Sequence, residues 1–252
     1  MSCCTIFPPT TASIKIITCF KYKNLKNNHL SFRHINQSPP TIAFEQVVPA
    51  PLMGVVAPSS QVWNTGLKLE PAQYYHVSAV SGKGKSTFVS ILYGLRSDYQ
   101  GQVLLQGKNI RSFTLDDWAN YRQACFSIVF QDLRLFLNYT GWENMLVKAD
   151  LYGKPDKEKI TRMAEALGVL PLLDKKCGLL SYGERQRMAI IRALVPPFQW
   201  LLLDEPFSHL DQSNIQRASQ LIAEECQARQ AGLVLTSLGG DNLFDYHQKV
   251  LL

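Results

Sequence analysis

The stretch that decides the fold reads SGKGKST and occupies residues 81–87. An apolar, β-prone run over 74–80 precedes it, and a helical pattern over about 85–95 follows it. A glycine-rich turn between a strand and a helix is the arrangement that a phosphate-binding loop requires. We therefore expect a nucleotide phosphate to be bound by the residues of this turn, which are Ser81, Gly82, Lys83, Gly84, Lys85, Ser86 and Thr87.

The residue types of this loop predict its chemistry. Glycines let successive backbone N–H groups converge on phosphate oxygens, and the helix N-terminus adds partial positive charge. Lys85 would reach the β- and γ-phosphates of ATP, and the Ser86 hydroxyl would ligate Mg²⁺. One position departs from G-x-x-x-x-G-K-[ST], because Ala79 stands where the first glycine is expected. Alanine is acceptable there if its φ angle is negative, since only a positive φ strongly favours glycine.

Two adjacent acids end an apolar segment far along the chain. Residues 200–203 read WLLL, and Asp204 and Glu205 follow directly. In an open α/β sheet, ligands bind at the carboxyl ends of the strands. Asp204 is therefore expected to hold Mg²⁺, directly or through water, and Glu205 to orient or deprotonate an attacking water.

Strands that alternate with helices predict a mainly parallel α/β sheet. One helix is expected between Pro155 and Gly168, and another from a cap at Ser213 or Asn214 toward Gln230. Three short, almost wholly apolar segments are typical of strands that are buried on both faces: 126–130, 200–203 and 233–236.

Positive charge is concentrated at the start of the chain. The net charge is +6, and all 20 acidic residues lie at or after Glu45, so residues 1–44 carry +5 and residues 45–252 carry +1. A basic charge indicates nucleic-acid binding only where it lies on a folded surface, so no nucleic-acid partner is expected. Residues 1–40 have three interpretations: a disordered tail, an organellar transit peptide, or a translation start assigned too early. The folded domain is expected over 41–252.

Three further motifs complete a recognisable set. LSYGERQR spans 180–187 and precedes a helical pattern, FQD spans 130–132, and SHLD spans 208–211. With the phosphate loop and the acid pair, they resemble the signature, Q-loop and D-loop of ATP-binding-cassette (ABC) ATPases, in that family's order. The resemblance covers about residues 41–252. It is strongest to the ATPases of lipoprotein-release, macrolide-efflux and cell-division systems, on residues 133–144.

The resemblance implies a fold and a set of partners. The fold would be the P-loop NTPase fold of ABC ATPases, an α/β domain with a mainly parallel core sheet, an antiparallel β portion near 41–75 and an α-helical subdomain near 132–180. ATP and Mg²⁺ would bind between two subunits, expected to form a homodimer that drives a separate integral membrane permease. The chain has no run of 18 apolar residues, so no part of it is expected to span a membrane. The resemblance implies a cytoplasmic protein, peripheral at the inner face of the cell membrane through the permease.

The resemblance also implies roles for individual residues. Gln131 would ligate Mg²⁺ or contact the attacking water. Ser181, Gly183 and Glu184 would face the ATP of the partner subunit from a helix N-terminus, which is a favourable place for an anion. Asp211 would contribute to the nucleotide site from the D-loop.

Leu238 is the departure that matters most for activity, because the family usually has a switch histidine there. Leucine cannot hydrogen-bond to a γ-phosphate or orient Glu205, and losing such a group typically lowers a rate about 10²–10⁴-fold. We therefore predict ATP binding with slow hydrolysis. A second hypothesis stays open, an ATP-gated binding protein with little or no hydrolysis and no coupling to transport. A repair or translation protein of the same family is disfavoured, because the chain has no long coiled-coil insert and no tandem cassette.

Two further departures concern the surroundings of the nucleotide. Tyr182 and Glu184 stand where the family signature has Gly and Gln, and Arg185 or Arg187 would offset the charge of Glu184. No aromatic residue lies near 52–57 to stack on adenine. By residue type the candidates are Phe44, Trp63 and Tyr74, each of which is more readily explained by packing.

Overall fold

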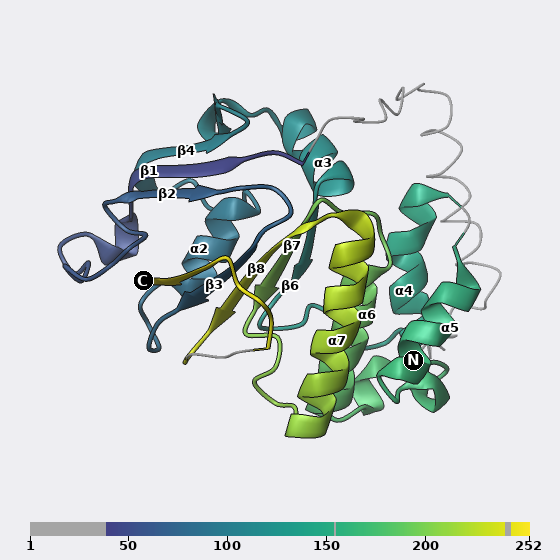
Figure 1. The fold of residues 1–252 in the computed structure, drawn as a ribbon. Helices are drawn as coiled ribbons and strands as arrows, with labels where there is room; N and C mark the ends of the chain where they lie inside the picture. The colour runs from purple at the N-terminus through teal and green to yellow at the C-terminus, as the bar shows by residue number, and fades with distance from the viewer. Residues whose placement is uncertain (1–38, 154, 240–242) are drawn as a thin grey trace, which may run out of the picture. The chain divides into compact units, whose positions relative to one another are not determined.

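Five parallel strands form the central sheet of the molecule (Figure 1). The computed structural model describes residues 39–153, 155–239 and 243–252. The strands are neighbours in the order β6-β7-β8-β3-β9, and each pairing is parallel, which confirms the predicted sheet. Their bounds are β3 (Tyr74–Ser78), β6 (Phe126–Val129), β7 (Trp200–Asp204), β8 (Gly232–Ser237) and β9 (Gln248–Leu251).

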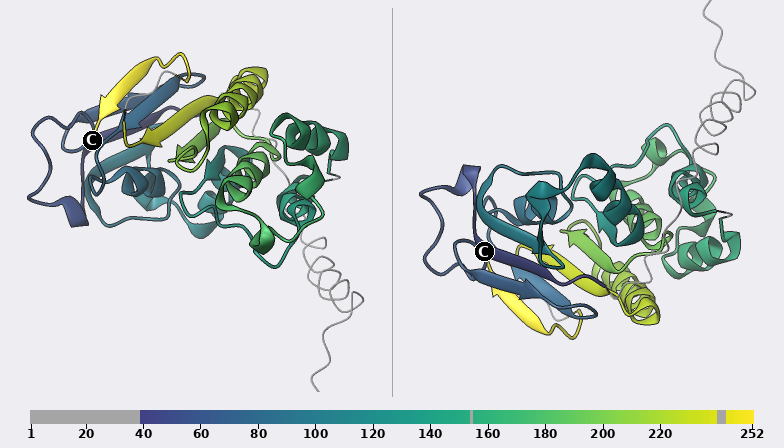
Figure 2. Two further views of the ribbon diagram at one scale, coloured as in Figure 1. Left: turned by 90° about the horizontal axis from the view of Figure 1, so that it is seen from below. Right: turned by 90° about the horizontal axis from the view of Figure 1, so that it is seen from above.

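Both faces of β6, β7 and β8 are covered by other elements, which explains why these strands are mainly apolar and buried, and helices lie on both sides of the sheet (Figure 2). Tyr75 and Trp200 lie in a core with α2, α3 and a second sheet, whereas Leu201 and Leu203 lie in a core with α6 and α7. Successive residues of a strand point to opposite faces, so both sets of side chains in these three strands are mainly buried, whereas Gln248 and Lys249 of the edge strand β9 are exposed. The covering helices are α2 (Lys85–Leu92), α3 (Leu115–Ala124), α6 (Tyr182–Leu194) and α7 (Gln212–Arg229).

The second sheet is antiparallel and has the strand order β2-β1-β4-β5. An antiparallel portion was expected near 41–75, but the sheet extends to Asn109, and β3 belongs to the parallel sheet instead. The reason lies in β1, where Ile42 pairs with Leu69 on one side and with Leu105 on the other. The strands are β1 (Ile42–Pro49), β2 (Gly66–Leu69), β4 (Tyr99–Leu105) and β5 (Lys108–Asn109).

The described part of residues 133–180 contains helices and no strand of either sheet, as expected for a helical subdomain. Its α4 (Gly141–Ala149) and α5 (Lys157–Ala166) pack in the same core as α6. Asp156 caps α5, and Gly168 follows its end with a φ of +64°. The 3₁₀ helices of the described chain are η1 (Ala50–Leu52), η2 (Ile110–Ser112), η3 (Asp150–Tyr152), η4 (Leu170–Leu172) and η5 (Cys177–Leu179).

The described residues begin at position 39, close to the proposed domain boundary. The proposed leader, 1–40, lies outside the described residues up to position 38. Pro40 is already buried, and its carbonyl accepts a hydrogen bond of 2.8 Å from the Trp200 indole. Among the described helices, none combines the length and the apolar character needed to cross a bilayer.

The parallel sheet brings distant motifs to one edge. Strands that run in the same direction end at the same edge, so the segments after β3, β6, β7 and β8 become neighbours. These segments carry the phosphate loop, Gln131, the pair Asp204 and Glu205, and Leu238.

The N-cap of α7 differs from the prediction. A cap was expected at Ser213 or Asn214, but the helix starts at Gln212 and its cap is Asp211. The Asp211 carboxylate accepts hydrogen bonds from the Asn214 backbone N–H at 2.9 Å and from the Asn214 side chain at 2.7 Å. These bonds lower the pKa of Asp211. Asp211 can both cap α7 and stand at the D-loop position, because a helix N-cap favours aspartate.

We predict that Asp211→Ala lowers the free energy of unfolding in the absence of nucleotide, because α7 loses its cap. The matched variant Ser213→Ala, at the position first expected to cap the helix, should change it by less than about 0.5 kcal/mol. Urea unfolding of both variants measures this. Equal destabilisation by the two substitutions would show that Asp211 is not the cap.

Candidate active site

The loop between β3 and α2 has the backbone of a phosphate cradle. Gly82 and Gly84 have φ angles of +79° and +101°, a region that favours glycine. Ala79 lies outside that region, so the alanine in place of the usual glycine is accommodated as expected. The loop runs directly into the first turn of α2, where backbone N–H groups attract an anion.

Side chains from the segment before β2 also contact the loop, and the sequence did not predict these contacts. The Trp63 indole donates a hydrogen bond of 3.2 Å to the Lys83 carbonyl. A Cβ atom on Gly84 would lie 2.8 Å from Leu52 Cδ1 and 3.2 Å from Trp63 Nε1. The glycine is therefore required both by its conformation and by the close approach of these neighbours.

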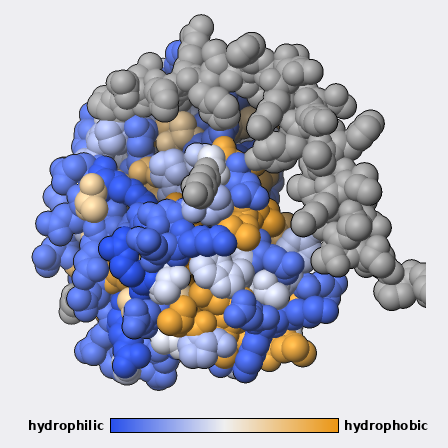
Figure 3. All heavy atoms as spheres, turned by 90° about the vertical axis from the view of Figure 1, so that its right-hand side faces the viewer, coloured by the Kyte–Doolittle hydropathy of each residue, from blue (hydrophilic) through white to orange (hydrophobic). Residues whose placement is uncertain are grey.

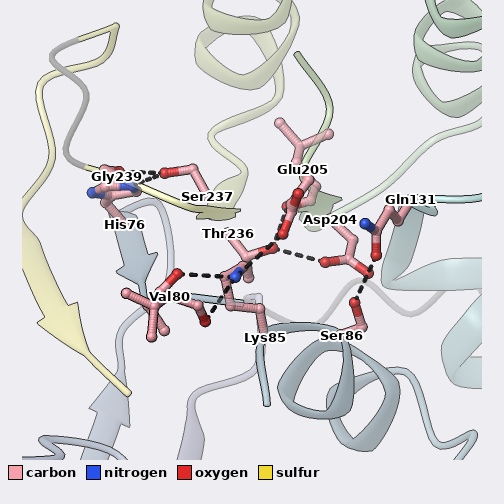
Figure 4. Close-up of polar contacts among 12 residues, drawn as sticks. His76, Val80, Lys85, Ser86, Gln131, Asp204, Glu205, Thr236, Ser237 and Gly239 are labelled. Atoms are coloured by element: carbon pink, nitrogen blue, oxygen red, sulfur yellow. Dashed lines mark hydrogen bonds and ion pairs between the residues drawn. The ribbon is translucent and has the colours of Figure 1, made fainter. Parts of the chain in front are cut away.

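Lys85 is buried at the centre of the site (Figure 4). Its ammonium group donates hydrogen bonds to the carbonyls of Ala79 at 2.9 Å and Val80 at 3.3 Å. Its third partner is the Glu205 carboxylate, with 3.3 Å between Nζ and Oε1 and side chains that are 5% and 11% exposed. A buried charge requires partners of this kind, and an anionic ligand entering the loop would compete with Glu205 for the ammonium group.

Three oxygen-bearing side chains converge beside Lys85. The Ser86 hydroxyl donates to the Gln131 side-chain oxygen at 3.2 Å, and Asp204 Oδ1 accepts a hydrogen bond of 2.8 Å from Thr236 (Figure 4). Hydroxyl, amide and carboxylate oxygens are the hard ligands that Mg²⁺ prefers, and Mg²⁺ usually completes its shell with phosphate oxygens and water. The donor set of Ser86, Gln131 and Asp204 therefore fits Mg²⁺ bound together with a nucleotide.

Asp204 is held in a site that disfavours its charge. Burial raises the pKa of Asp204, and hydrogen bonds from Ser86 and Thr236 oppose this shift only in part. The neighbouring Glu205 raises the pKa of Asp204 further, whereas Lys85 lowers it. A bound divalent cation would favour the carboxylate form of Asp204.

The backbone of Glu205, the residue after β7, leaves the extended conformation of the strand. Its φ angle is +50°, an uncommon conformation for a residue with a side chain. Its N–H donates to the Thr236 carbonyl at 3.1 Å, and its carbonyl accepts from Gln186 Nε2 at 3.4 Å. Backbone conformations of this kind are found where the surroundings impose them, often at functional sites.

The remaining candidate residues form a second group at the start of α6. The Ser181 hydroxyl accepts from the Glu184 N–H at 3.3 Å, and the Glu184 carboxylate accepts from the Ser181 N–H at 2.7 Å. This capping box lowers the pKa of Glu184, chiefly through the bond from Ser181. The Glu184 carboxylate thus finds its main hydrogen-bond partner at the helix N-terminus, and the charge of Arg187 lowers its pKa less. The described hydrogen bonds and ion pairs link neither Ser181 nor Glu184 to the phosphate loop of the same chain.

The position of the expected switch histidine holds the exposed side chain of Leu238, which is 56% accessible. A histidine does lie nearby, because Nε2 of the buried His76 is 2.7 Å from the hydroxyl of Ser237 (Figure 4). No role was predicted for His76 from the sequence. The sequence feature that marks it is a polar residue within the mainly apolar run of 74–80.

None of the three aromatic candidates offers an open stacking platform. Phe44 is 1% exposed and Trp63 is 2% exposed, and both lie in the core that contains α2. Tyr74 packs edge-on against Phe244, with ring centroids 6.2 Å apart. Within 52–57, where no aromatic residue is found, the side chain of Leu52 borders Gly84 of the loop.

Comparison with known proteins agrees with this geometry. A family model described as ABC transporter matches residues 62–208. The chain is 36% identical over 160 residues to the thiamine import ATP-binding protein of Histophilus somni, a match that spans 62% of this chain and 72% of that protein. It is 32% identical over 182 residues to a lipoprotein-releasing system ATP-binding protein of Rhodopirellula baltica, spanning 71% and 79%. For other relatives the match spans from 27% to 86% of the relative's length.

A solved structure supports the same fold. A bacterial ABC transporter cassette, solved as a dimer, superposes with a TM-score of 0.67 at 23% sequence identity. The superposition covers 77% of this chain and 87% of that chain. At this identity the likeness establishes the architecture of the domain.

We predict that Asp204→Asn raises the melting temperature at neutral pH when nucleotide and Mg²⁺ are absent, while it weakens Mg²⁺-dependent nucleotide binding. The pKa of Asp204 is higher in the folded than in the unfolded chain, so the ionised carboxylate costs stability above the folded-state pKa. That cost disappears below the unfolded-state pKa, so the difference between variant and wild type should shrink as the pH falls. Thermal unfolding over a pH series measures it.

The control is Asp174→Asn, at an exposed position, which should leave the melting temperature unchanged. An Asp204→Asn variant that melts below the wild type at neutral pH would contradict the stated cost of the buried carboxylate.

Proposed function

Because this chain belongs to the ABC transporter family of ATP-binding proteins, we propose that it binds and hydrolyses Mg·ATP to power a membrane permease. The observation that carries the proposal is the meeting of Lys85, Ser86, Asp204 and Glu205 at one edge of the parallel sheet. A positive charge, a hydroxyl and two acids around a phosphate cradle are the groups that phosphoryl transfer to water requires.

The proposed reaction is an in-line attack of water on the γ-phosphate. The loop N–H groups and Lys85 would stabilise the charge on the phosphate oxygens. Mg²⁺, held by Ser86, Asp204 and Gln131, would neutralise phosphate charge when bound. Glu205 would leave its ion pair with Lys85 and orient or deprotonate the water. The present contact between Glu205 and Lys85 supports this assignment, because it places the carboxylate within reach of the phosphate site.

We further propose that two copies of the chain enclose the nucleotides. Ser181 caps α6, whose first turn contains Gly183 and Glu184, and Asp211 caps α7. The described hydrogen bonds of the Ser181, Glu184 and Asp211 side chains stay within these helix starts. A second chain facing the loop would complete the site with these residues. The capping box supports a role for Ser181, since the hydroxyl accepts one hydrogen bond and keeps its own proton for a phosphate oxygen.

An apolar patch supports a permease partner. It consists of Phe136, Leu137, Tyr139 and Leu179, which are 52%, 48%, 43% and 80% exposed. Backbone bonds join its two segments, from Cys177 to Tyr139 and from Gly178 to Leu137, each 2.8 Å long. Figure 3 shows apolar side chains gathered on the side of the molecule that carries α4 and α5. Exposed apolar surface of this kind marks an interaction site, and we propose that it binds the cytoplasmic side of a permease.

Glu205→Gln should lower kcat for ATP hydrolysis by at least about 10²-fold while ATP binding is retained, because the amide cannot accept the proton of water. Phosphate release at saturating ATP measures the rate, and binding of a fluorescent ATP analogue measures affinity. Glu165→Gln, at an exposed position of α5, is the matched control and should hydrolyse like the wild type. Equal rates near zero for the wild type and Glu205→Gln would mean that the chain binds ATP without using it.

Leu238→His should raise kcat by about 10-fold or more, because an imidazole at the end of β8 can bind the γ-phosphate and orient Glu205. Steady-state hydrolysis by the full chain checks the rate. Leu238→Asn serves as the control, since it is polar but cannot exchange a proton at neutral pH. A histidine variant no faster than the wild type would show that another group already performs this task.

A further inference from the structure

Tyr182, the residue that stands in place of a glycine in the signature motif, contacts two segments that border the nucleotide site. Its hydroxyl donates a hydrogen bond of 2.9 Å to the backbone carbonyl of Gln131. Its ring lies against His209 of the D-loop, with centroids 4.2 Å apart. A glycine at this position has no side chain and could make neither contact.

One turn further along α6, Gln186 contacts the segment that carries the proposed catalytic base, Glu205. Gln186, which is 1% exposed, accepts a hydrogen bond from the His209 N–H at 3.2 Å. Its amide group donates to the Glu205 carbonyl at 3.4 Å. The start of α6 is therefore bonded at one point to the backbone of Gln131 and at another to the backbone of Glu205.

The backbone after Gln131 has a conformation that its own sequence does not favour. Leu133 and Arg134 have φ angles of +60° and +46°, in the left-handed region, and neither is glycine. Arg192 of α6 holds this turn with hydrogen bonds of 2.6 Å to each of the two carbonyls. Such a turn persists only where its surroundings fix it, so each bond from α6 contributes to its geometry.

We propose that Tyr182 is a positioning residue for ATP hydrolysis, and this proposal rests on the function proposed above. By fixing the Gln131 carbonyl, the Tyr182 hydroxyl holds the Gln131 side chain where its oxygen meets Ser86, 3.2 Å away. The amide oxygen is thereby kept in the place where it can serve Mg²⁺. Since α6 begins at the proposed contact with the partner's nucleotide, Tyr182 links the nucleotide bound across the dimer to the magnesium ligands of its own chain.

Tyr182→Phe removes the hydroxyl and keeps the ring on His209. Losing one hydrogen bond of this kind should raise the Mg²⁺ concentration needed for half-maximal binding of a fluorescent ATP analogue about 2- to 10-fold. kcat should fall by a similar factor, with KM for ATP unchanged. Amide hydrogen exchange of a peptide covering residues 130–135 should become faster in the absence of nucleotide, because the tether at Gln131 is lost.

Tyr152→Phe is the matched control. The Tyr152 hydroxyl donates a bond of 2.8 Å to the Gln123 carbonyl, so the same change removes an equivalent contact away from the nucleotide site. This variant should keep the wild-type Mg²⁺ dependence, kcat and exchange of 130–135. Thermal unfolding of both variants verifies that they fold.

Wild-type Mg²⁺ dependence and exchange in Tyr182→Phe would overturn the positioning role while the proposed function stands. Equal changes in Tyr182→Phe and Tyr152→Phe would also overturn it, because the effect would then be general. A wild-type chain that neither binds nor hydrolyses ATP would overturn the proposed function itself. If Tyr182→Phe still showed faster exchange of 130–135 in that case, Tyr182 would only stabilise the local structure and would have no role in hydrolysis.

Discussion

The buried ammonium group of Lys85 constrains the arrangement of the whole site. A charge in such a place needs close acceptors, and removing one partner of a buried ion pair typically costs about 3–5 kcal/mol. Two of its acceptors are the carbonyls of Ala79 and Val80, which fixes the path of the loop. The third is Glu205, which fixes the end of β7 beside that loop. The phosphate loop and the Glu205 carboxylate are thus held together in the structure.

The order of the strands makes this arrangement possible. β8 lies between β7 and β3, so Thr236 of β8 can contact both Asp204 and Glu205 at the end of β7. Segments from four strands, far apart in the chain, reach one edge because the strands run in the same direction. The two cores on either face of the sheet keep that edge rigid, and rigid elements are what a site with exact distances between charged groups needs.

Much of the site could be predicted from the sequence because its signals are local. The glycines of the phosphate loop are demanded by backbone angles, and the pair Asp204 and Glu205 ends a strand that is apolar on both faces. The other features depend on tertiary contacts that no local pattern reveals. The bond between His76 and Ser237 and the contact of Tyr182 with Gln131 belong to this class. The capping box of Glu184 does not, because Ser181 and Glu184 are three residues apart and form a local S-x-x-E pattern. The sequence also did not predict that β4 belongs to the antiparallel sheet. β4 pairs with the second edge of β1, which is far away in the sequence.

We expect bound ATP to replace Glu205 as the partner of Lys85. A crystal structure of the chain with Mg²⁺ and a non-hydrolysable ATP analogue measures this directly. In that structure Lys85 Nζ should bind phosphate oxygens and lie beyond ion-pair distance of Glu205, compared with the present 3.3 Å, while Gly82 and Gly84 should keep their positive φ angles. A structure with the nucleotide bound and the pair between Lys85 and Glu205 intact would contradict it.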